Sequence, residues 1–454
     1  MSTLNSLFFQ LQLFSNNRRV FVLVSTLLLF LFCSLSSQGQ EHIITKRLRA
    51  SVVKVDITPK TPKWLLGYGP RQSKSVRDHI YHRIVALDDG VTQFFLVQSD
   101  FAVISPSEYD HVASLLKKQT GIDHLNFWWS VTHTHSAPEL GVPGMPEIFL
   151  PERYKHEVDT EYTSMVEQAL INGIIEARKK LTPAKIGVGW GHSQANINRR
   201  AIGSNGKVYL GENPDGAVDR RIGILRIDKA DGNPLALIAN YPIHGTVLGA
   251  NLEISGDVPG VVSEYVEEKF GVPLLFINGA EGNIAPIYSG AGSGRINQFK
   301  VLLGDKILDA ASRKITSSTD KIKLYTGSMV VETPRKEGLG WSTDLIKYSK
   351  SGNGKGPNMV RMPVRFLKIN EEIAIWSAPI ELFCEVSNEI RESSPFPYTF
   401  YFGITNGTLG YLPTASAWEQ GGYETTVSPF TPMAAKDLTE AVLGYLHGEM
   451  LSIH

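Results

Sequence analysis

The stretch that decides the fold is Asn126-Phe-Trp-Trp-Ser-Val-Thr-His-Thr-His135, an apolar run that ends in two histidines. Such a run predicts a buried strand, in which residues i and i+2 project from the same face. His133 and His135 could therefore offer two imidazole nitrogens to one divalent metal at the carboxyl end of the strand, where open α/β sheets bind their ligands. A His-x-His pair by itself is also typical of a surface or hydrogen-bonded pair, so the interpretation depends on the rest of the chain.

Apolar runs of strand length recur along the sequence and alternate with helical patterns. The predicted strands are Ala50–Ile57, Tyr81–Leu87, Phe94–Ser99, Asn126–Thr132, Lys185–Trp190, Ile222–Ile227, Leu235–Tyr241, Pro273–Asn278, Val360–Ile369 and Ile373–Ser377. The predicted helices are Glu157–Leu181, Val258–Phe270, Phe299–Ser312, Glu381–Arg391 and Ala434–Leu451. This alternation indicates an α/β fold with mixed β-sheets flanked by helices. We see no clear linker, so one large domain over residues 41–454 is expected.

Residues 1–40 are expected to be a secretory signal peptide. A short cationic segment, Asn16–Arg19, precedes the apolar run Val20–Phe32, which is followed by small and polar residues up to Gln40. The apolar run is shorter than the roughly 20 residues that a membrane-spanning helix needs. The sequence therefore predicts an exported protein, and an uncleaved membrane anchor is the alternative.

Composition excludes some partners. The 454 residues are 42% hydrophobic and 20% charged, with 45 basic and 45 acidic side chains. No dense basic patch is interleaved with aromatic residues, so nucleic acid is not an expected partner. Removal of residues 1–40 would leave Cys384 as the single cysteine, so stability must come from core burial rather than from an internal disulfide.

Several other predicted strands end in polar residues, as the opening one does. Asp100, His244, Asn278 and Glu381 follow such runs. If these strands share a sheet and a direction, their polar ends converge on one rim. Each residue also has a structural interpretation: His244 as a turn histidine, Glu381 as a favourable acid in the first turn of a helix, and Asp257 as a helix cap.

Taken together, the motifs resemble those of the neutral (non-lysosomal) ceramidases over most of residues 50–430. The resemblance rests on Gly67-Tyr-Gly, Thr132-His-Thr-His-Ser136, Asn198-Arg199 with Asn213-Pro214, His244 followed by Ile254-Ser-Gly-Asp257, Asn278-Gly-Ala-Glu-Gly-Asn-Ile-Ala-Pro286, Ala378-Pro-Ile-Glu381, Asn406-Gly-Thr-Leu-Gly-Tyr411 and Gly421-Gly-Tyr-Glu424. Their order and rough spacing match the catalytic domain of that family.

The resemblance implies a zinc hydrolase that uses metal-activated water. The zinc ligands that it implies are His133, His244, Glu381 and Tyr411. The catalytic residues are His135, Asp257 and Asn283, and the substrate-binding residues are Gly67, Asn198, Arg199 and Tyr423. Two imidazoles and a carboxylate are a common catalytic zinc set, and His135 could pass a proton to the leaving group.

Three departures from the family pattern bear on the substrate. Ala285 stands where the ceramidases have an active-site serine, and Glu139 lies in a segment that is glycine-rich in the family. The chain also ends shortly after the catalytic region, so the family's C-terminal β-sandwich domain is not expected within it. The implied activity is hydrolysis of an amide bond in an N-acylated, ceramide-like lipid.

Two alternatives remain open. One is a zinc-dependent hydrolase or lyase for a glycan or acylated sugar, which the aromatic residues Trp418, Tyr423 and Tyr411 near Glu419 and Glu424 would suit. The other is a binding protein that keeps the metal site without turnover. The expected partner is therefore a small lipid or glycan, with peripheral membrane contact left open and the oligomeric state undetermined.

Overall fold

The opening apolar run forms strand β7, Phe127–Val131, and all five residues are buried. The computed structural model describes residues 47–69, 71–141, 157–313 and 321–451. β7 is the edge strand of an eight-stranded sheet with the order β14-β12-β11-β8-β1-β5-β6-β7. The other strands are β1 (Arg49–Asp56), β5 (Tyr81–Asp88), β6 (Gln93–Ser99), β8 (Thr182–His192), β11 (Arg221–Lys229), β12 (Pro234–Tyr241) and β14 (Leu274–Asn278).

This first sheet is mixed, as expected. Its inner neighbours are antiparallel, whereas β6 pairs with β7 and β12 pairs with β14 in parallel. The parallel pairs lie at the two ends of the strand order. The sheet curls, and its two ends approach each other. Asn278 Nδ2, at the end of β14, donates to the Thr132 carbonyl after β7 at 3.1 Å. The carboxyl ends of β7, β12 and β14 therefore meet.

A second sheet faces the first. It has the order β16-β18-β19-β21, and β17 also pairs with β18. Its strands are β16 (Leu324–Pro334), β17 (Ser349–Lys350), β18 (Met359–Ile369), β19 (Ile373–Ser377) and β21 (Tyr398–Phe402). β19 and β21 are parallel and the other pairs are antiparallel. This sheet also ends in parallel strands whose carboxyl ends lie side by side.

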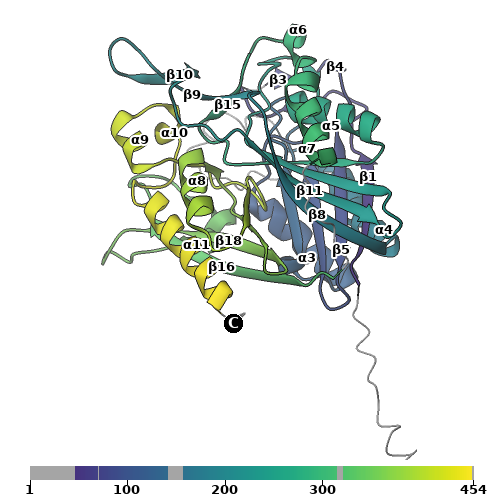
Figure 1. Ribbon diagram of the computed structural model, residues 1–454. Helices are drawn as coiled ribbons and strands as arrows, with labels where there is room; N and C mark the ends of the chain where they lie inside the picture. Colours follow the sequence, from purple (N-terminus) through teal and green to yellow (C-terminus); the bar gives the residue numbers. More distant parts are fainter. Residues whose placement is uncertain (1–46, 70, 142–156, 314–320, 452–454) are drawn as a thin grey trace, which may run out of the picture. The chain divides into compact units, whose positions relative to one another are not determined.

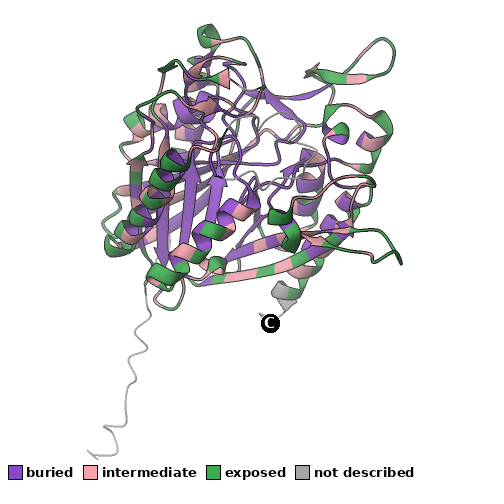
Figure 2. Ribbon diagram, turned by 180° about the vertical axis from the view of Figure 1, so that it is seen from behind, coloured by how far each residue is buried: buried purple, intermediate pink, exposed green. Residues whose placement is uncertain are grey.

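One apolar core fills the space between the two sheets. Phe94 and Trp128 from the first sheet and Ile375 and Phe400 from the second are at most 1% exposed and belong to one cluster. The Phe94 and Trp128 rings meet edge to face at 5.3 Å. Figure 2 shows the strands as the most continuously buried part of the chain. Burial of this apolar surface is the main force that holds the sheets together.

Helices cover the outer face of each sheet (Figure 1). α3 (Pro106–Thr120), α4 (Thr160–Lys179), α5 (Asp257–Phe270) and α7 (Asp305–Arg313) pack on the first sheet. α8 (Cys384–Ser393) and α11 (Ala434–Leu451) pack on the second. The result is a four-layer αββα sandwich, which confirms the predicted α/β class with mixed sheets and flanking helices. No helix in the described ranges is both long and apolar enough to cross a membrane.

The ten predicted strands are all present, but the helices were predicted less well. The sequence analysis missed α3, although Ser105 accepts the Glu108 amide at 3.0 Å as its N-cap, Pro106 follows, and Gly121 ends the helix at φ 77°. The predicted helix Phe299–Ser312 is split into a π-helical segment, Lys300–Gly304, and α7. The predicted signal peptide lies outside the described residues.

Short elements complete the framework around the strand ends. They are β2 (Trp64–Leu65), β3 (Arg71–Gln72), β4 (Ser75–Val76), β9 (Asn196–Ile202), β10 (Val208–Asn213), β13 (Glu253–Ile254), β15 (Ile284–Pro286), β20 (Glu381–Leu382), β22 (Tyr411–Leu412), α6 (Ser293–Ile296), α9 (Ala415–Gln420), α10 (Tyr423–Thr426), and the 3₁₀ turns His124–Asn126 and Thr343–Tyr348. β9, β10 and β15 form a small antiparallel sheet.

Candidate metal centre

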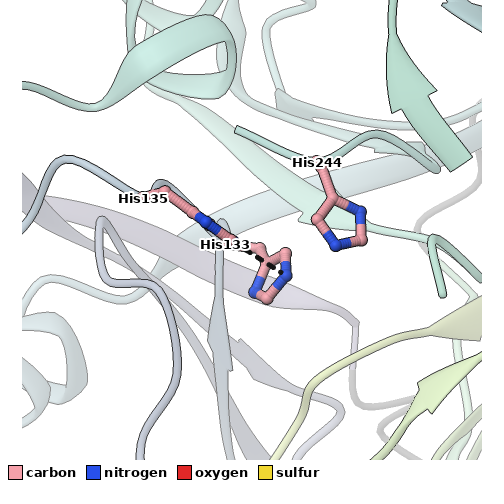
Figure 3. A group of neighbouring side chains, drawn as sticks. All are labelled: His133, His135 and His244. Atoms are coloured by element: carbon pink, nitrogen blue, oxygen red, sulfur yellow. Dashed lines mark hydrogen bonds between the residues drawn. The ribbon is translucent and has the colours of Figure 1, made fainter. Parts of the chain in front are cut away.

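The histidine pair lies just beyond β7, and its geometry differs from the expected one. β7 ends at Val131, and His133 has φ 63° in the left-handed region. The pair is therefore not on one face of a strand, because the chain turns between the strand end and His135. The turn still brings the two Nε2 atoms to 3.3 Å from each other. Figure 3 shows the two rings beside that of His244.

Two of the three histidines are fixed through the same ring nitrogen. His133 Nδ1 lies 2.7 Å from the Ala102 carbonyl, and His244 Nδ1 lies 2.8 Å from the Ile284 carbonyl. A carbonyl only accepts, so each Nδ1 carries the proton and each Nε2 keeps its lone pair. The two ring centroids are 4.4 Å apart. This is the tautomer that metal-binding histidines usually have.

The second sheet supplies a carboxylate and a phenol to the same place. Glu381 follows β19 in β20, and Tyr411 follows β21 in β22; the two are aligned as a parallel pair. The Glu381 amide donates to the Gly410 carbonyl at 3.0 Å, which fixes this pairing. The sequence predicts Glu381 in the first turn of a helix, and this prediction is wrong, because α8 begins three residues later at Cys384.

The spacing of these side chains fits one tetrahedral zinc ion. Glu381 Oε2 lies 3.3 Å from His133 Nε2 and 3.6 Å from His244 Nε2, and the Tyr411 hydroxyl lies 3.5 Å from His244 Nε2. Ligands about 2.0–2.1 Å from a tetrahedral zinc are about 3.3 Å from one another. Glu381 Oε2 is also buried without a hydrogen-bond partner among the described residues. The residues present therefore fit the metal that the resemblance implies.

The protonation states favour a cation. Burial, followed by the charge of Arg199, lowers the pKa of His244 to about 3. Burial and the two neighbouring histidines hold the pKa of His135 well below its ordinary value. Burial alone would raise the pKa of Glu381, but His133 and His244 hold it well below the usual range. Neutral imidazoles and an ionised carboxylate are the forms that bind a metal.

Arg199 lies at the edge of this cluster and is held from behind. Its Nε donates to Glu424 Oε1 at 2.8 Å, and Arg200 Nη1 donates to Glu424 Oε2 at 2.6 Å. Arg199 Nη1 donates to the Nε2 lone pair of His244 at 2.7 Å, so a metal on that nitrogen requires this hydrogen bond to open. Arg199 Nη2 is buried with no partner in the described part of the chain. The motif that ends at Glu424 was quoted from the sequence, but the role of this carboxylate was missed.

Glu281 is a second residue that sequence reasoning missed. It is 0% exposed, and neither carboxyl oxygen has a hydrogen-bond partner among the described residues. One of its oxygens lies with His133 and Glu381 in a group whose ligand atoms are within 4.8 Å of one another. Burial, and then the charge of Glu381, raises the pKa of Glu281 well above its usual value. The feature that marks Glu281 is its buried carboxyl group without a partner, and only the structure reveals this feature.

Three of the predicted site residues contact the segments that support the cluster. The Asp257 carboxylate accepts the amides of Val247 and Leu248, in the loop after His244, at 3.1 and 3.0 Å. Asn283 Oδ1 accepts the Cys384 amide at 3.0 Å, and its carbonyl accepts the Arg199 amide at 2.9 Å. Asn198 donates to the Ala217 carbonyl at 2.8 Å. Asn283 Nδ2 also donates to Glu385 Oε2 at 2.8 Å. Because these contacts hold the segments around the cluster, we expect the three residues to position the site.

The remaining predicted residues, Gly67 and Tyr423, lie against members of the cluster. Gly67 has φ 113°, and a Cβ there would lie 2.5 Å from His135 Cγ, so only glycine allows His135 its place. The Tyr423 ring meets that of Tyr411 edge to face at 5.7 Å and is 37% exposed. Ala285 lies in β15, next to the carbonyl of Ile284 that holds His244. The serine hydroxyl of the ceramidase pattern is therefore absent beside the cluster.

The fold is similar to solved ceramidases. The crystal structure of neutral ceramidase from Pseudomonas aeruginosa matches with a TM-score of 0.70 and 17% identity, over 87% of this chain and 73% of that chain. A ceramidase complexed with C2 matches with the same TM-score and identity over 74% of its chain. At this identity the likeness establishes the fold alone: an αββα sandwich of the ceramidase type.

Sequence comparison identifies the family. The family profile described as neutral/alkaline non-lysosomal ceramidase, N-terminal, matches residues 50–285. Neutral ceramidase B of Dictyostelium discoideum is 27% identical over 244 residues, which cover 49% of this chain and 33% of that protein. Neutral ceramidase of Pseudomonas aeruginosa is 25% identical over 260 residues, covering 52% and 37%. The chain belongs to the neutral/alkaline non-lysosomal ceramidase family. Its matched part spans about a third of the curated relatives' own length.

Proposed function

We propose that the protein is a zinc-dependent hydrolase that cleaves the amide bond of an N-acylated, ceramide-like lipid. One observation carries the zinc assignment: His133 and His244 both bind backbone carbonyls through Nδ1 and turn Nε2 toward Glu381 Oε2, at 3.3 and 3.6 Å. These two histidines follow strands of the first sheet, and Glu381 and Tyr411 follow strands of the second. His133, His244, Glu381 and Tyr411 would hold the ion.

A bound zinc ion would supply Lewis acidity and activate a water molecule. The chain's own residues then account for the remaining chemistry. Arg199 keeps one buried donor, Nη2, that can bind a substrate carbonyl oxygen, while Glu424 fixes the guanidinium. His135 Nδ1 is buried without a hydrogen-bond partner among the described residues, so this imidazole is placed to pass a proton to the leaving amine.

The substrate class rests on family membership. The relatives that match this chain are named neutral ceramidases. A ceramide joins an acyl chain to an amine through one amide bond, and the site offers a proton donor and a carbonyl-binding donor for such a bond. Zinc removal with a chelator and N-acylsphingosine as substrate provide the test. We expect hydrolysis that stops on chelation and returns with zinc.

Two results would overturn this proposal. Turnover of N-acylsphingosine that survives complete zinc removal would contradict the metal assignment. Stoichiometric zinc with no turnover of any N-acylated lipid would contradict the hydrolase assignment and favour a metal-containing binding protein.

A polar substrate is the second candidate, and one observation favours it. Ala285 replaces the serine of the ceramidase pattern, and Tyr423 stands 37% exposed beside Tyr411. An exposed aromatic ring can stack on a sugar as well as on an acyl chain. Parallel assays with N-acylsphingosine and with N-acetylated sugars decide between the two. A higher kcat/KM for the sugar would replace the lipid assignment.

Export and membrane contact belong to the same proposal. The apolar run Val20–Phe32 supports export, and a lipid substrate would bring the protein to a membrane surface. Mass spectrometry of the protein from its native host tests the first point. A mature N-terminus near residue 41 is expected, and an intact Met1 in a soluble cell fraction would contradict it.

A further inference from the structure

A cleft of about 450 Å³ lies on the side of α3 that faces the second sheet. One face of α3 forms one wall through Tyr109 and Lys117, and β18 forms the other through Arg361 and Arg365. Tyr348, at the end of the 3₁₀ turn Thr343–Tyr348, also lines it. None of the residues assigned to the metal centre lines this cleft. Its volume is in the range that binds small molecules.

The wall on β18 changes character along one face of the strand. Alternate residues of a strand share a face, so Arg361, Pro363, Arg365, Leu367 and Ile369 are on one side. Leu367 and Ile369 are 3% and 1% exposed in the core between the sheets. The next position on this face, Arg365, places a guanidinium at the edge of the core instead of another apolar side chain. The apolar part of this face of β18 therefore ends at a charged side chain, which lines the cleft.

Arg365 has no hydrogen-bond or ion-pair partner among the described residues. The other cations of the cleft are paired: Lys117 with Asp123 at 3.0 Å, Arg361 with Glu332 at 3.2 Å, and Lys347 with Asp110. Asp110, the one acid lining the cleft in the described ranges, also accepts the Tyr348 hydroxyl at 2.9 Å. The cleft thus carries one positive charge that no group in the described part of the chain neutralises.

Two buried donors accompany this charge. Ser377 is directly opposite Arg365 in the β18–β19 register, is 1% exposed, and its hydroxyl has no partner in the described structure. Asn406 is 5% exposed; its Oδ1 accepts the Trp129 amide at 2.8 Å, whereas its Nδ2 has no partner among the described residues. Both residues line the cleft. Leaving two such groups unpaired costs about 1–3 kcal/mol each.

We propose that this cleft binds the oxyanion of a small molecule, a phosphate or phosphate ester, at a site separate from the metal centre. A guanidinium, a hydroxyl and an amide NH₂ are all donors, and together they match the acceptor oxygens of such an anion. The rings of Tyr109 and Tyr348 give the rest of the cleft an apolar surface for an organic group.

Isothermal titration of the zinc-loaded protein with inorganic phosphate tests the proposal, with ionic strength held constant by chloride. We expect saturable binding that Arg365→Gln weakens about tenfold or more, because it removes a charge-assisted contact. Arg361→Gln is the matched control: it removes an arginine of the same cleft that is already paired with Glu332, so a change below about twofold is expected. Ser377→Ala should weaken binding by a smaller factor than Arg365→Gln.

The metal centre could itself bind phosphate, so the titration is repeated on His133→Ala. Binding that persists in His133→Ala and is lost in Arg365→Gln supports the cleft site. Binding lost in His133→Ala and kept in Arg365→Gln, no saturable binding, or equal losses in Arg365→Gln and Arg361→Gln would each overturn it. Phenyl phosphate and phosphatidic acid vesicles distinguish a soluble ester from a lipid headgroup as the source of the same anion. The ligand with the lower Kd of the two identifies the source of the anion.

Discussion

Two regions of the first sheet contain buried histidines, and they use them differently. His82, in β5, is 0% exposed; its Nδ1 lies 2.6 Å from Ser99 Oγ and its Nε2 lies 3.1 Å from the Val166 carbonyl. His133 and His244, beyond β7 and β12, are also buried, at 3% and 0% exposed, and each binds a backbone carbonyl through Nδ1, whereas Nε2 faces charged or titratable side chains, including Arg199 beside His244. The Nε2 atom of His133 lies near the Glu381 carboxylate, and the Nε2 atom of His244 lies near the Tyr411 hydroxyl.

This difference teaches that burial alone does not mark a functional histidine. A buried imidazole whose two nitrogens bind only a hydroxyl and a backbone carbonyl, as in His82, is a core residue. An imidazole with one nitrogen fixed and the other aimed at an unpaired carboxylate oxygen is built to bind something else. We therefore expect substitution of the two kinds of histidine to have different effects on zinc content and on stability.

The largest effect is expected from removing a proposed ligand. His133→Ala or His244→Ala should lose zinc and reduce kcat/KM by about a thousandfold or more, because several kcal/mol of transition-state stabilisation depend on the metal. His111→Ala is the control, since His111 is exposed at 57% of its side chain. Zinc content by mass spectrometry and rates on N-acylsphingosine are the measurements. Full zinc retention in both variants would show that His133 and His244 are not metal ligands and do not differ from His82 in this respect.

A smaller loss is expected for His135, which lies beside the cluster. His135→Ala should keep stoichiometric zinc but lower kcat by about 10²–10⁴-fold, the usual contribution of a general acid or base. The Nε2 of His135 lies 3.3 Å from that of His133, so the alternative is that His135 is itself a ligand. Loss of zinc in this variant would favour that alternative, and an unchanged kcat would exclude His135 from the reaction.

His82 should affect stability and not metal content. Burial lowers its pKa from 6.5 to about 4. In the unfolded chain His82 binds a proton as the pH falls below 6.5, whereas in the folded protein it does so only near pH 4. The free energy of unfolding therefore decreases as the pH falls from 6.5 to 4, and it levels off below pH 4. The loss is about 3 kcal/mol. Urea unfolding between pH 4 and 7 measures it, and His82→Gln should remove this part of the slope while keeping zinc.

The smallest effect is expected for Glu281, the carboxyl that neighbours the cluster. Glu281→Gln keeps the shape of the side chain but removes its ability to ionise beside a bound cation, so zinc affinity should fall by about tenfold. The free energy of unfolding should change by less than about 1 kcal/mol. Glu268→Gln, at an exposed position of α5, is the control. Zinc competition titration with a chromogenic chelator gives both affinities. Equal affinities in the two variants would show that Glu281 does not act on the metal.

The sequence predicted the strands well because each is a dense apolar run, and the sandwich buries them on both faces. It could not predict the position of His133, because the left-handed turn after Val131 is set by contacts with Ala102 and Gly245 far along the chain. The prediction for Glu381 was wrong for a similar reason. Glu381, in β20, pairs with Tyr411 of β22, thirty residues downstream, whereas the local pattern alone favours a helix start.

The site residues were found mainly through motif resemblance, and the contacts divide them into groups. Residues whose side chains bear directly on the cluster, such as Arg199, could be named from motifs. The roles of Glu424 and Glu281 could not be predicted, because they depend on an ion pair with Arg199 and on burial beside Glu381. Acidic side chains are common in any sequence, and nothing local distinguishes a solvated one from a buried one.

X-ray absorption and anomalous diffraction at the zinc edge test the central claim most directly. We predict one zinc per chain, with two imidazole nitrogens and oxygen ligands, located between His133, His244, Glu381 and Tyr411. A zinc ion found elsewhere, or a first shell without the Nε2 atoms of His133 and His244, would contradict the account.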